Sequence, residues 1–292
     1  MLQEIGLVHY TVLFILGAAV GSFLGVLSSR YSDRKGFAGA SRGRSRCDYC
    51  RKTLRWYELV PLVSFLIQLG KCRSCKKRLS WRYPLVETLS GLIAVGVPLK
   101  IGFSFYSIIW ILVFWILIAV SLTDLRLKII PNPLVVLLTF LGITNVTYGY
   151  FSRDFSSSAP PGAVRAGMDL LGHYSLLGHF GETLLLDYLI AVICSFALFG
   201  GLYFFTRGRA MGFGDVKLAS AFGFLAHWPD IIAVLSLSFI VGSLVGLPLV
   251  FMRKFSFKTS IPFGPFLALG LTLTFFFGYD IISAYFRLFG LA

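Results

Sequence analysis

The fold is organised around one short stretch, Met211-Gly212-Phe213-Gly214-Asp215-Val216-Lys217. This stretch places an acid beside two glycines, at the point where a basic loop returns to apolar sequence. An ionisable residue at a membrane boundary is costly to desolvate, so it indicates a functional site when a partner is available. The candidate partner is Asp124, in Ser121-Leu122-Thr123-Asp124-Leu125.

The composition sets the class of protein. Of the 292 residues, 57% are hydrophobic and only 14% are charged, and the mean hydropathy is +0.80. A soluble single-core domain of this length does not have such a composition. The first apolar run, from Val8 to about Ser28, follows Glu4 and no basic residue. It therefore lacks the positive start of a signal peptide and predicts a retained transmembrane helix.

Apolar runs of about 20 residues predict membrane helices. We therefore expect an all-α polytopic membrane protein with about eight transmembrane helices, and the cysteines described below predict a small cytoplasmic zinc-knuckle segment as well. We expect three regions: a first helix over 1–29, a basic cytoplasmic segment over 30–83, and a transmembrane core over 84–292. The expected spans are His9–Ser28, Pro84–Lys100, Phe105–Thr123, Pro133–Phe151, Leu184–Phe205, Asp215–His227, Ile231–Met252 and Phe263–Ile282. The sixth is short, and 152–182 between the fourth and fifth reads as an irregular outer loop.

The distribution of basic residues predicts the orientation. Between Arg30 and Arg82 lie 15 of the 27 basic residues, against three acids. Loops rich in Lys and Arg remain cytoplasmic, and alternating spans then place 23 of the 27 basic residues on the cytoplasmic side. Asp124 and Asp215 fall at the same cytoplasmic face. The net charge of +14 thus reflects topology and contact with an anionic bilayer, and we expect no nucleic-acid partner.

Four cysteines of the cytoplasmic segment predict a metal site. Cys47 and Cys50 form one CxxC knuckle, Cys72 and Cys75 form another, and 21 residues separate them. Four thiolates at this spacing suit a tetrahedral structural zinc. A disulfide or redox pair is the alternative, which a reducing cytoplasm disfavours.

Two further features lie near this segment. The run Trp56–Ile67 is apolar but too short and Pro-broken to span, so we expect it to lie against the bilayer surface. Glu87, near the cytoplasmic start of the second span, either pairs with a loop arginine or contacts a cationic group of a substrate.

The two aspartates have a chemical interpretation if they meet. Two adjacent carboxyl groups do not both ionise readily, so they share a proton and can divide acid and base roles, as in aspartic proteases. Gly212 and Gly214 would let a substrate backbone pass close to Asp215. The alternative for Asp215 alone is a helix N-cap or an ion partner.

Several ordered motifs resemble those of the type IV prepilin peptidases. They are Gly21-Ser22-Phe23-Leu24, both knuckles, Ser80 through Glu87, Asp124 through Asn132, Gly212 through Lys217, and Ile261-Pro262-Phe263-Gly264-Pro265. The resemblance implies an integral-membrane aspartic protease of the bacterial inner membrane, which cleaves the basic leaders of prepilins at the cytoplasmic side. It also implies Asp124 and Asp215 as the catalytic pair, and N-methylation of the product with S-adenosylmethionine.

One departure bears on the methylation. Gly25 stands where this family usually has asparagine, which weakens the expectation that methyl transfer is retained. Two other functions stay open: an intramembrane GxGD protease of other substrates, which would not need the knuckles, and a transporter that uses the acids for ion coupling.

Overall fold

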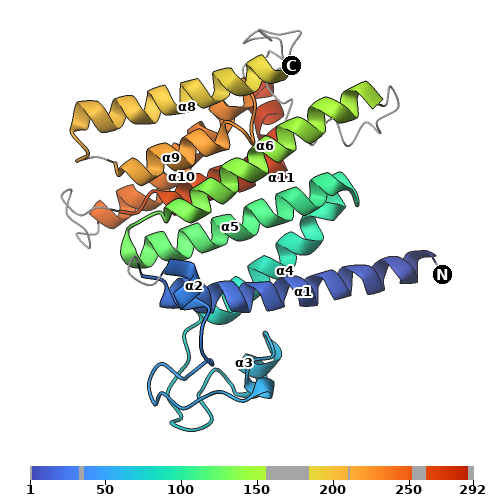
Figure 1. The fold of residues 1–292 in the computed structure, drawn as a ribbon, viewed down its shortest axis with the longest axis vertical. Helices are drawn as coiled ribbons and strands as arrows, with labels where there is room; N and C mark the ends of the chain where they lie inside the picture. The colour runs from blue at the N-terminus through green and yellow to red at the C-terminus, as the bar shows by residue number, and fades with distance from the viewer. Residues whose placement is uncertain (1, 33–35, 156–183, 210, 252–260, 289–292) are drawn as a thin grey trace. The chain divides into compact units, whose positions relative to one another are not determined.

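The structure is a computed structural model that describes residues 2–32, 36–155, 184–209, 211–251 and 261–288 (Figure 1). Its regular elements over these residues are helices, with two isolated β-bridges, which confirms the predicted all-α class. The predicted outer loop lies outside the described residues from residue 156 onward. The chain forms two compact units, one of residues 1–99 and 110–123 and the other of residues 100–109 and 124–292.

The first unit contains the N-terminal helices and residues 41–81, which carry the four knuckle cysteines and which we call the cysteine segment. Its elements are α1 (Leu2–Arg30), α2 (Gly36–Ala40), η1 (Trp56–Glu58), α3 (Val63–Ile67), α4 (Arg82–Ile101) and the central part of α5 (Phe105–Leu127). Glycines bring α1 and α4 close together: a Cβ atom at Gly17 would lie 2.7 Å from the Cβ of Ala94, and one at Gly21 would lie 2.6 Å from that of Ser90. Small residues four apart allow such close approach between membrane helices.

The second unit contains the remaining helices, α6 (Asn132–Phe155), α8 (Leu184–Thr206), α9 (Phe213–Phe222), α10 (Asp230–Phe251) and α11 (Gly264–Leu288). Helix α9 packs against α8 and α6 and also contacts α11, while α10 pairs with α11 (Figure 1). Side chains on several sides of α9, such as Val216, Leu218 and Phe222, are buried. The short helix that carries Asp215 is thus held inside a bundle of longer ones.

The count of spans agrees with about eight once α9 is followed to its end. Seven helices of the described residues are long and apolar enough to cross a membrane, and α9, with ten residues, is not among them. Yet the ring of Phe213 meets Tyr203 near the end of α8, and the N–H of Trp228 donates to the carbonyl of Asp187 in the first turn of α8. The segment 213–228 therefore runs back along most of α8, as a short helix followed by a turn. Helix α9 ends at Phe222, and the chain then passes close to α8 at Gly223, where a Cβ atom would lie 2.6 Å from the backbone of Val192.

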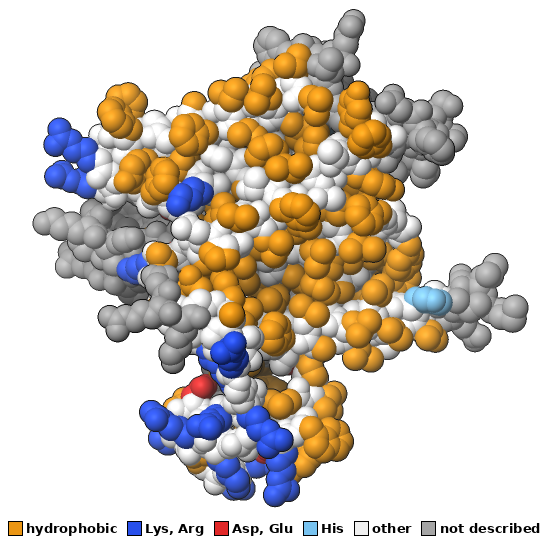
Figure 2. Space-filling model, in the orientation of Figure 1, with side chains coloured by type: hydrophobic (Ala, Val, Ile, Leu, Met, Phe, Trp, Pro, Cys, Tyr) orange, Lys and Arg blue, Asp and Glu red, His pale blue; other side chains and the backbone are white. Residues whose placement is uncertain are grey.

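The cysteine segment carries both charge and apolar surface. Figure 2 shows many of the Lys and Arg side chains gathered on the part of the first unit that holds α3. Several large apolar side chains of the same segment are also exposed, namely Trp56, Val63, Leu66, Ile67, Leu69 and Trp81. We call these six residues the apolar rim. Their exposure fits a surface helix at a bilayer, and the bilayer contact itself stays a prediction.

Candidate functional site

Asp124 lies in the last turn of α5 and is 4% exposed. The helix ends three residues later, at Leu127, because Lys128 adopts a left-handed conformation with φ of 55° and donates its N–H to the carbonyl of Asp124. One carboxylate oxygen, Oδ2, accepts a hydrogen bond of 2.9 Å from the N–H of Gly264, the first residue of α11. A contact across 140 residues of sequence thus fixes the orientation of this acid.

Asp215 lies in the first turn of α9 and is 8% exposed. Its Oδ2 accepts a hydrogen bond of 3.2 Å from the N–H of Gly212, which precedes the helix. The N-cap residue is Gly212, and Asp215 stands three residues later, so it makes the return contact of a capping box and is not the N-cap that the alternative predicts. Its other oxygen, Oδ1, is buried, and no group of the described residues donates to it. A buried acceptor without a partner is rare and indicates a place for a ligand or water.

The two acids are neighbours. Their carboxyl groups lie within range of each other's charge, and both belong to the second unit. Both are buried, and neither forms an ion pair with a Lys or Arg of the described residues. Two such carboxyl groups can share one proton, so the pair can act as acid and base together.

Other motif residues surround the pair. A Cβ atom on Gly214 would lie 3.1 Å from the Cβ of Ile130, so this glycine allows the start of α9 to approach the segment between α5 and α6. Lys217 donates from Nζ to Oδ1 of Asn132 at 3.0 Å, and its charge lies 4.9 Å from the centre of the Phe213 ring. Gly212, by contrast, has room for a Cβ atom, whose nearest neighbour would be Oδ2 of Asp215 at 3.5 Å.

Gly264 is the site residue that the sequence reasoning did not single out. A Cβ atom at this position would lie 2.6 Å from Oδ2 of Asp124, so only glycine lets the backbone N–H reach the carboxylate. The signal was its place in the motif Ile261–Pro265. Nothing in a single sequence shows that this motif meets Asp124.

The four knuckle cysteines come together as predicted. Their sulfur atoms all lie within 4.8 Å of one another, and Sγ of Cys47 lies 3.9 Å from Sγ of Cys75. A tetrahedral zinc with Zn–S bonds of about 2.3 Å requires sulfur atoms about 3.8 Å apart. All five cysteines of the chain are free thiols, so the disulfide alternative is not supported. The donor set therefore fits a zinc ion.

The two knuckles also fold alike. In each, the first cysteine's carbonyl accepts the N–H of the residue four positions on, Arg51 or Lys76, and both of these adopt a positive φ. The backbone N–H groups of Cys75 and Ser74 lower the pKa of the Cys72 thiol to about 7, against the opposing effect of burial. Stabilisation of a thiolate by backbone donors is what a metal ligand needs.

Glu87 lies in the first unit, where it is 7% exposed. Its Oε2 accepts a hydrogen bond of 2.7 Å from the N–H of Leu62, a residue with φ of 60°. The side chain of Ser22 is its second partner. The sequence analysis expected either a loop arginine or a cationic group of a substrate as the partner of Glu87. The structure gives it a backbone N–H and a hydroxyl in place of the arginine, and contact with a substrate stays a prediction.

Two protein-family models match successive parts of the chain, one with the cysteines and one with the two aspartates. Residues 15–101 match the bacterial peptidase A24 N-terminal domain, and residues 111–247 match the type IV leader peptidase family. No solved structure matches the chain.

Full-length relatives match as well, and three of them are named prepilin leader peptidase/N-methyltransferase. The relative from Stutzerimonas stutzeri is 32% identical over 93% of this chain and 91% of its own length. That from Pseudomonas aeruginosa is 30% identical over 94% and 93%, and that from Bacillus subtilis is 29% identical over 95% and 98%. With the two acids, the four cysteines and the motif order all in place, the chain belongs to the type IV leader peptidase family.

Proposed function

We propose that this protein is an integral-membrane aspartic endopeptidase that removes the leader peptides of type IV prepilins or related pseudopilins. The observation that carries the proposal is the pair of buried, neighbouring carboxyl groups of Asp124 and Asp215, which come from different helices of the second unit. The family match and the names of the relatives support the substrate class.

The chemistry follows from one shared proton. The ionised carboxyl group takes a proton from water, and the water oxygen attacks the scissile carbonyl carbon. The protonated carboxyl group gives its proton to the carbonyl oxygen. Collapse of the tetrahedral intermediate then breaks the C–N bond. The carboxyl group that took the proton of water gives it to the leaving amine, and the other carboxylate takes back a proton from a hydroxyl of the intermediate as the new carboxyl group forms. The unpartnered Oδ1 of Asp215 is available to accept a hydrogen bond from the attacking water.

Recognition of the substrate should depend on its apolar helix. The cytoplasmic face around the two acids carries Arg126, Lys128, Arg207, Arg209 and Lys217. These positive charges would repel a basic leader. Packing of the apolar substrate segment between helices is therefore the better source of affinity. The excess of basic residues in the same loops supports a location of the site at the cytoplasmic face of the inner membrane.

We infer two accessory groups. Cys47, Cys50, Cys72 and Cys75 would hold a structural zinc ion, which would stabilise a segment with little core of its own. The relatives' name also supports a second activity, N-methylation of the new N-terminus of the product. S-adenosylmethionine would supply the methyl group for that reaction.

The test uses the full chain in lipid vesicles with a full-length prepilin, and mass spectrometry of the product N-terminus. Asp124→Asn and Asp215→Asn should each reduce cleavage at least about 1,000-fold, because either change removes the shared-proton pair. Asp280→Asn, at an exposed aspartate of α11, is the matched control and should cleave normally. Full activity of either catalytic variant would refute the proposal. The same spectra report whether the product is methylated.

A further inference from the structure

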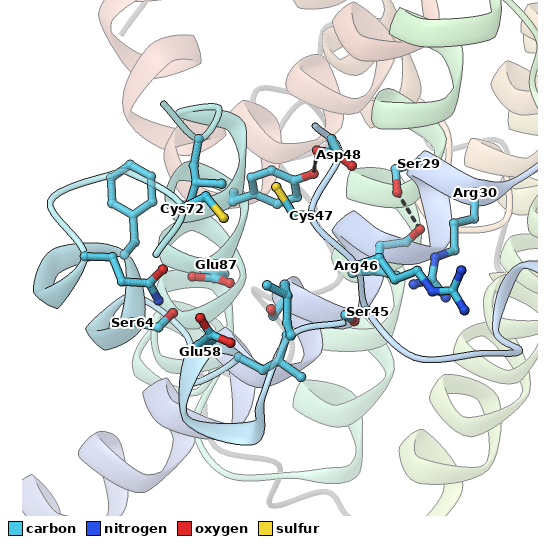
Figure 3. A pocket seen from close by; sticks show the side chains of 18 residues that line it. Ser29, Arg30, Ser45, Arg46, Cys47, Asp48, Glu58, Ser64, Cys72 and Glu87 are labelled. Carbon is cyan, nitrogen blue, oxygen red and sulfur yellow. Dashed lines mark hydrogen bonds between the residues drawn. The ribbon is translucent and has the colours of Figure 1, made fainter. Parts of the chain in front are cut away.

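Among the basic residues whose side chains the structure describes, Arg30 and Lys217 are partly buried and the others are exposed. Arg30 ends α1 and is labelled in Figure 3. Its guanidinium donates to the backbone carbonyls of residues 42, 43 and 44, so it connects two segments of the first unit. Lys217 is the partly buried cation of the second unit, and it stands two residues after the catalytic Asp215.

The side chain of Lys217 reaches another helix and not the catalytic carboxyl group. Residues two apart on a helix do not face each other, so Lys217 and Asp215 lie on different sides of α9. The Nζ atom of Lys217 donates to Oδ1 of Asn132, the first residue of α6, at 3.0 Å. The centre of the Phe213 ring, one turn earlier on α9, lies 4.9 Å from the same nitrogen. The ammonium group is thus held between its own helix and α6.

The partner of Lys217 closes a short connection that leads back to the other catalytic acid. Helix α5 ends three residues after Asp124, and α6 begins at Asn132. Residues 128–131 are all that separates the two helices. A shift at Asn132 therefore reaches Asp124 through this connection and the last turn of α5.

The start of α9 holds this connection at two points. A Cβ atom on Gly214 would lie 3.1 Å from the Cβ of Ile130, so α9 and the connection are in close contact there. Lys217 binds Asn132, two residues further along the connection. One contact would leave the connection free to pivot against α9, whereas two fix its direction as well as its distance. The two contacts together therefore set how far apart the catalytic acids lie.

We infer that Lys217 and Asn132 are positioning residues of the peptidase site, whose hydrogen bond sets the separation of the Asp124 and Asp215 carboxyl groups. The inference rests on the proposed peptidase function. Sharing a proton requires the two carboxyl groups to be in place, and a misplacement of about 1 Å reduces a catalytic rate about 100-fold. Loss of the contact should therefore lower kcat. A lysine that bound the substrate would instead act on KM.

The test measures kcat and KM separately, with the full chain in lipid vesicles and a full-length prepilin. Lys217→Met keeps a long side chain and removes the donor. Asn132→Ala removes the acceptor and leaves the charge of Lys217 in place. We expect each variant to lower kcat at least about tenfold and to leave KM within about twofold. The double variant should lose at most about threefold more than the weaker single variant, because both residues act through one contact.

Two further variants separate the contact from charge and from folding. Asn132→Asp keeps an acceptor oxygen and should cleave within about threefold of the wild type. Arg209→Met removes an exposed positive charge shortly before α9 and should cleave normally. Melting temperatures show which variants fold. If Lys217→Met does not fold, the comparison of Asn132→Ala with Asn132→Asp decides the question alone.

Any of four results would overturn the inference. The first is normal cleavage by folded Asn132→Ala, which would mean that the contact does not matter even if Lys217→Met is impaired. The second is a raised KM with unchanged kcat, which would place Lys217 at the substrate. The third is an Asn132→Asp variant as impaired as Asn132→Ala. The fourth is a double variant whose loss equals the product of the two single losses.

The catalytic variants Asp124→Asn and Asp215→Asn are assayed beside these. If both are inactive while the variants of Lys217 and Asn132 cleave normally, the positioning role is wrong and the proposed function stands. Normal cleavage by either aspartate variant would refute the proposed function itself.

Discussion

The substitution Gly264→Ala tests whether the backbone contact to Asp124 organises the peptidase site. The added Cβ atom would lie 2.6 Å from Oδ2 of Asp124, whereas the N–H of Gly264 now donates to that oxygen at 2.9 Å. Relief to an ordinary contact of about 3.4 Å moves the carboxylate by about 0.8 Å. A misplacement of about 1 Å in a catalytic site reduces the rate about 100-fold. We therefore expect kcat/KM for leader cleavage to fall about 100-fold.

The stability of the fold should change much less than the rate. The atom in the way is the end of an aspartate side chain, which can rotate, and alanine favours the helical conformation over glycine by about 1 kcal/mol. Cleavage of a full-length prepilin in vesicles and thermal unfolding of the same protein measure the two effects. Gly201→Ala in α8 is the control, because a Cβ atom there meets nothing within 4 Å. If Gly264→Ala cleaves within threefold of the wild type, Gly264 does not position Asp124.

Three further predictions concern the metal, the start of α9 and the bilayer. Cys47→Ser should lower the zinc content from about one ion per chain to less than about 0.2 by elemental analysis, with only partial loss of cleavage. Wild-type protein free of metal would contradict this prediction. Gly214→Val should reduce cleavage about tenfold or more, because even a Cβ atom at this position lies 3.1 Å from Ile130; normal cleavage would show that α9 can shift without harm. A benzophenone amino acid at Leu66, in the apolar rim, should crosslink to lipid in anionic vesicles. The same probe at Tyr49, which is also exposed, should crosslink less. Equal yields would count against the predicted bilayer contact.

Much of the fold could be predicted from local sequence. Apolar runs mark membrane helices directly, because burial in lipid requires about 20 apolar residues whatever the neighbours are. The spacing of the cysteines in the two CxxC knuckles likewise predicts their local structure, since each pair binds the metal from a tight turn. The sixth predicted span is the exception, because α9 has only ten residues and continues along α8 as a turn, and the apolar sequence does not show where the helix ends.

The site was predictable in its side chains and not in its backbone. Asp124 and Asp215 stand out because acids are rare in apolar sequence. The groups that hold them are the N–H donors of Gly264 and Gly212, and the N–H of Leu62 holds Glu87 in the same way. Every residue but proline has such a donor, so composition and spacing carry no sign of which one is used.

The unpartnered Oδ1 of Asp215 has a consequence for inhibitors. A compound that places a secondary hydroxyl where the scissile carbonyl would lie could donate to this oxygen, and a hydrogen bond to a charged group contributes about 1.5–3 kcal/mol. That corresponds to a gain in affinity of about 10- to 150-fold over the matching deoxy compound. The gain should vanish in Asp215→Asn if the amide nitrogen occupies the position of Oδ1. Pairs of hydroxyl and deoxy peptidomimetics with an apolar tail are therefore the first inhibitors to synthesise against this enzyme.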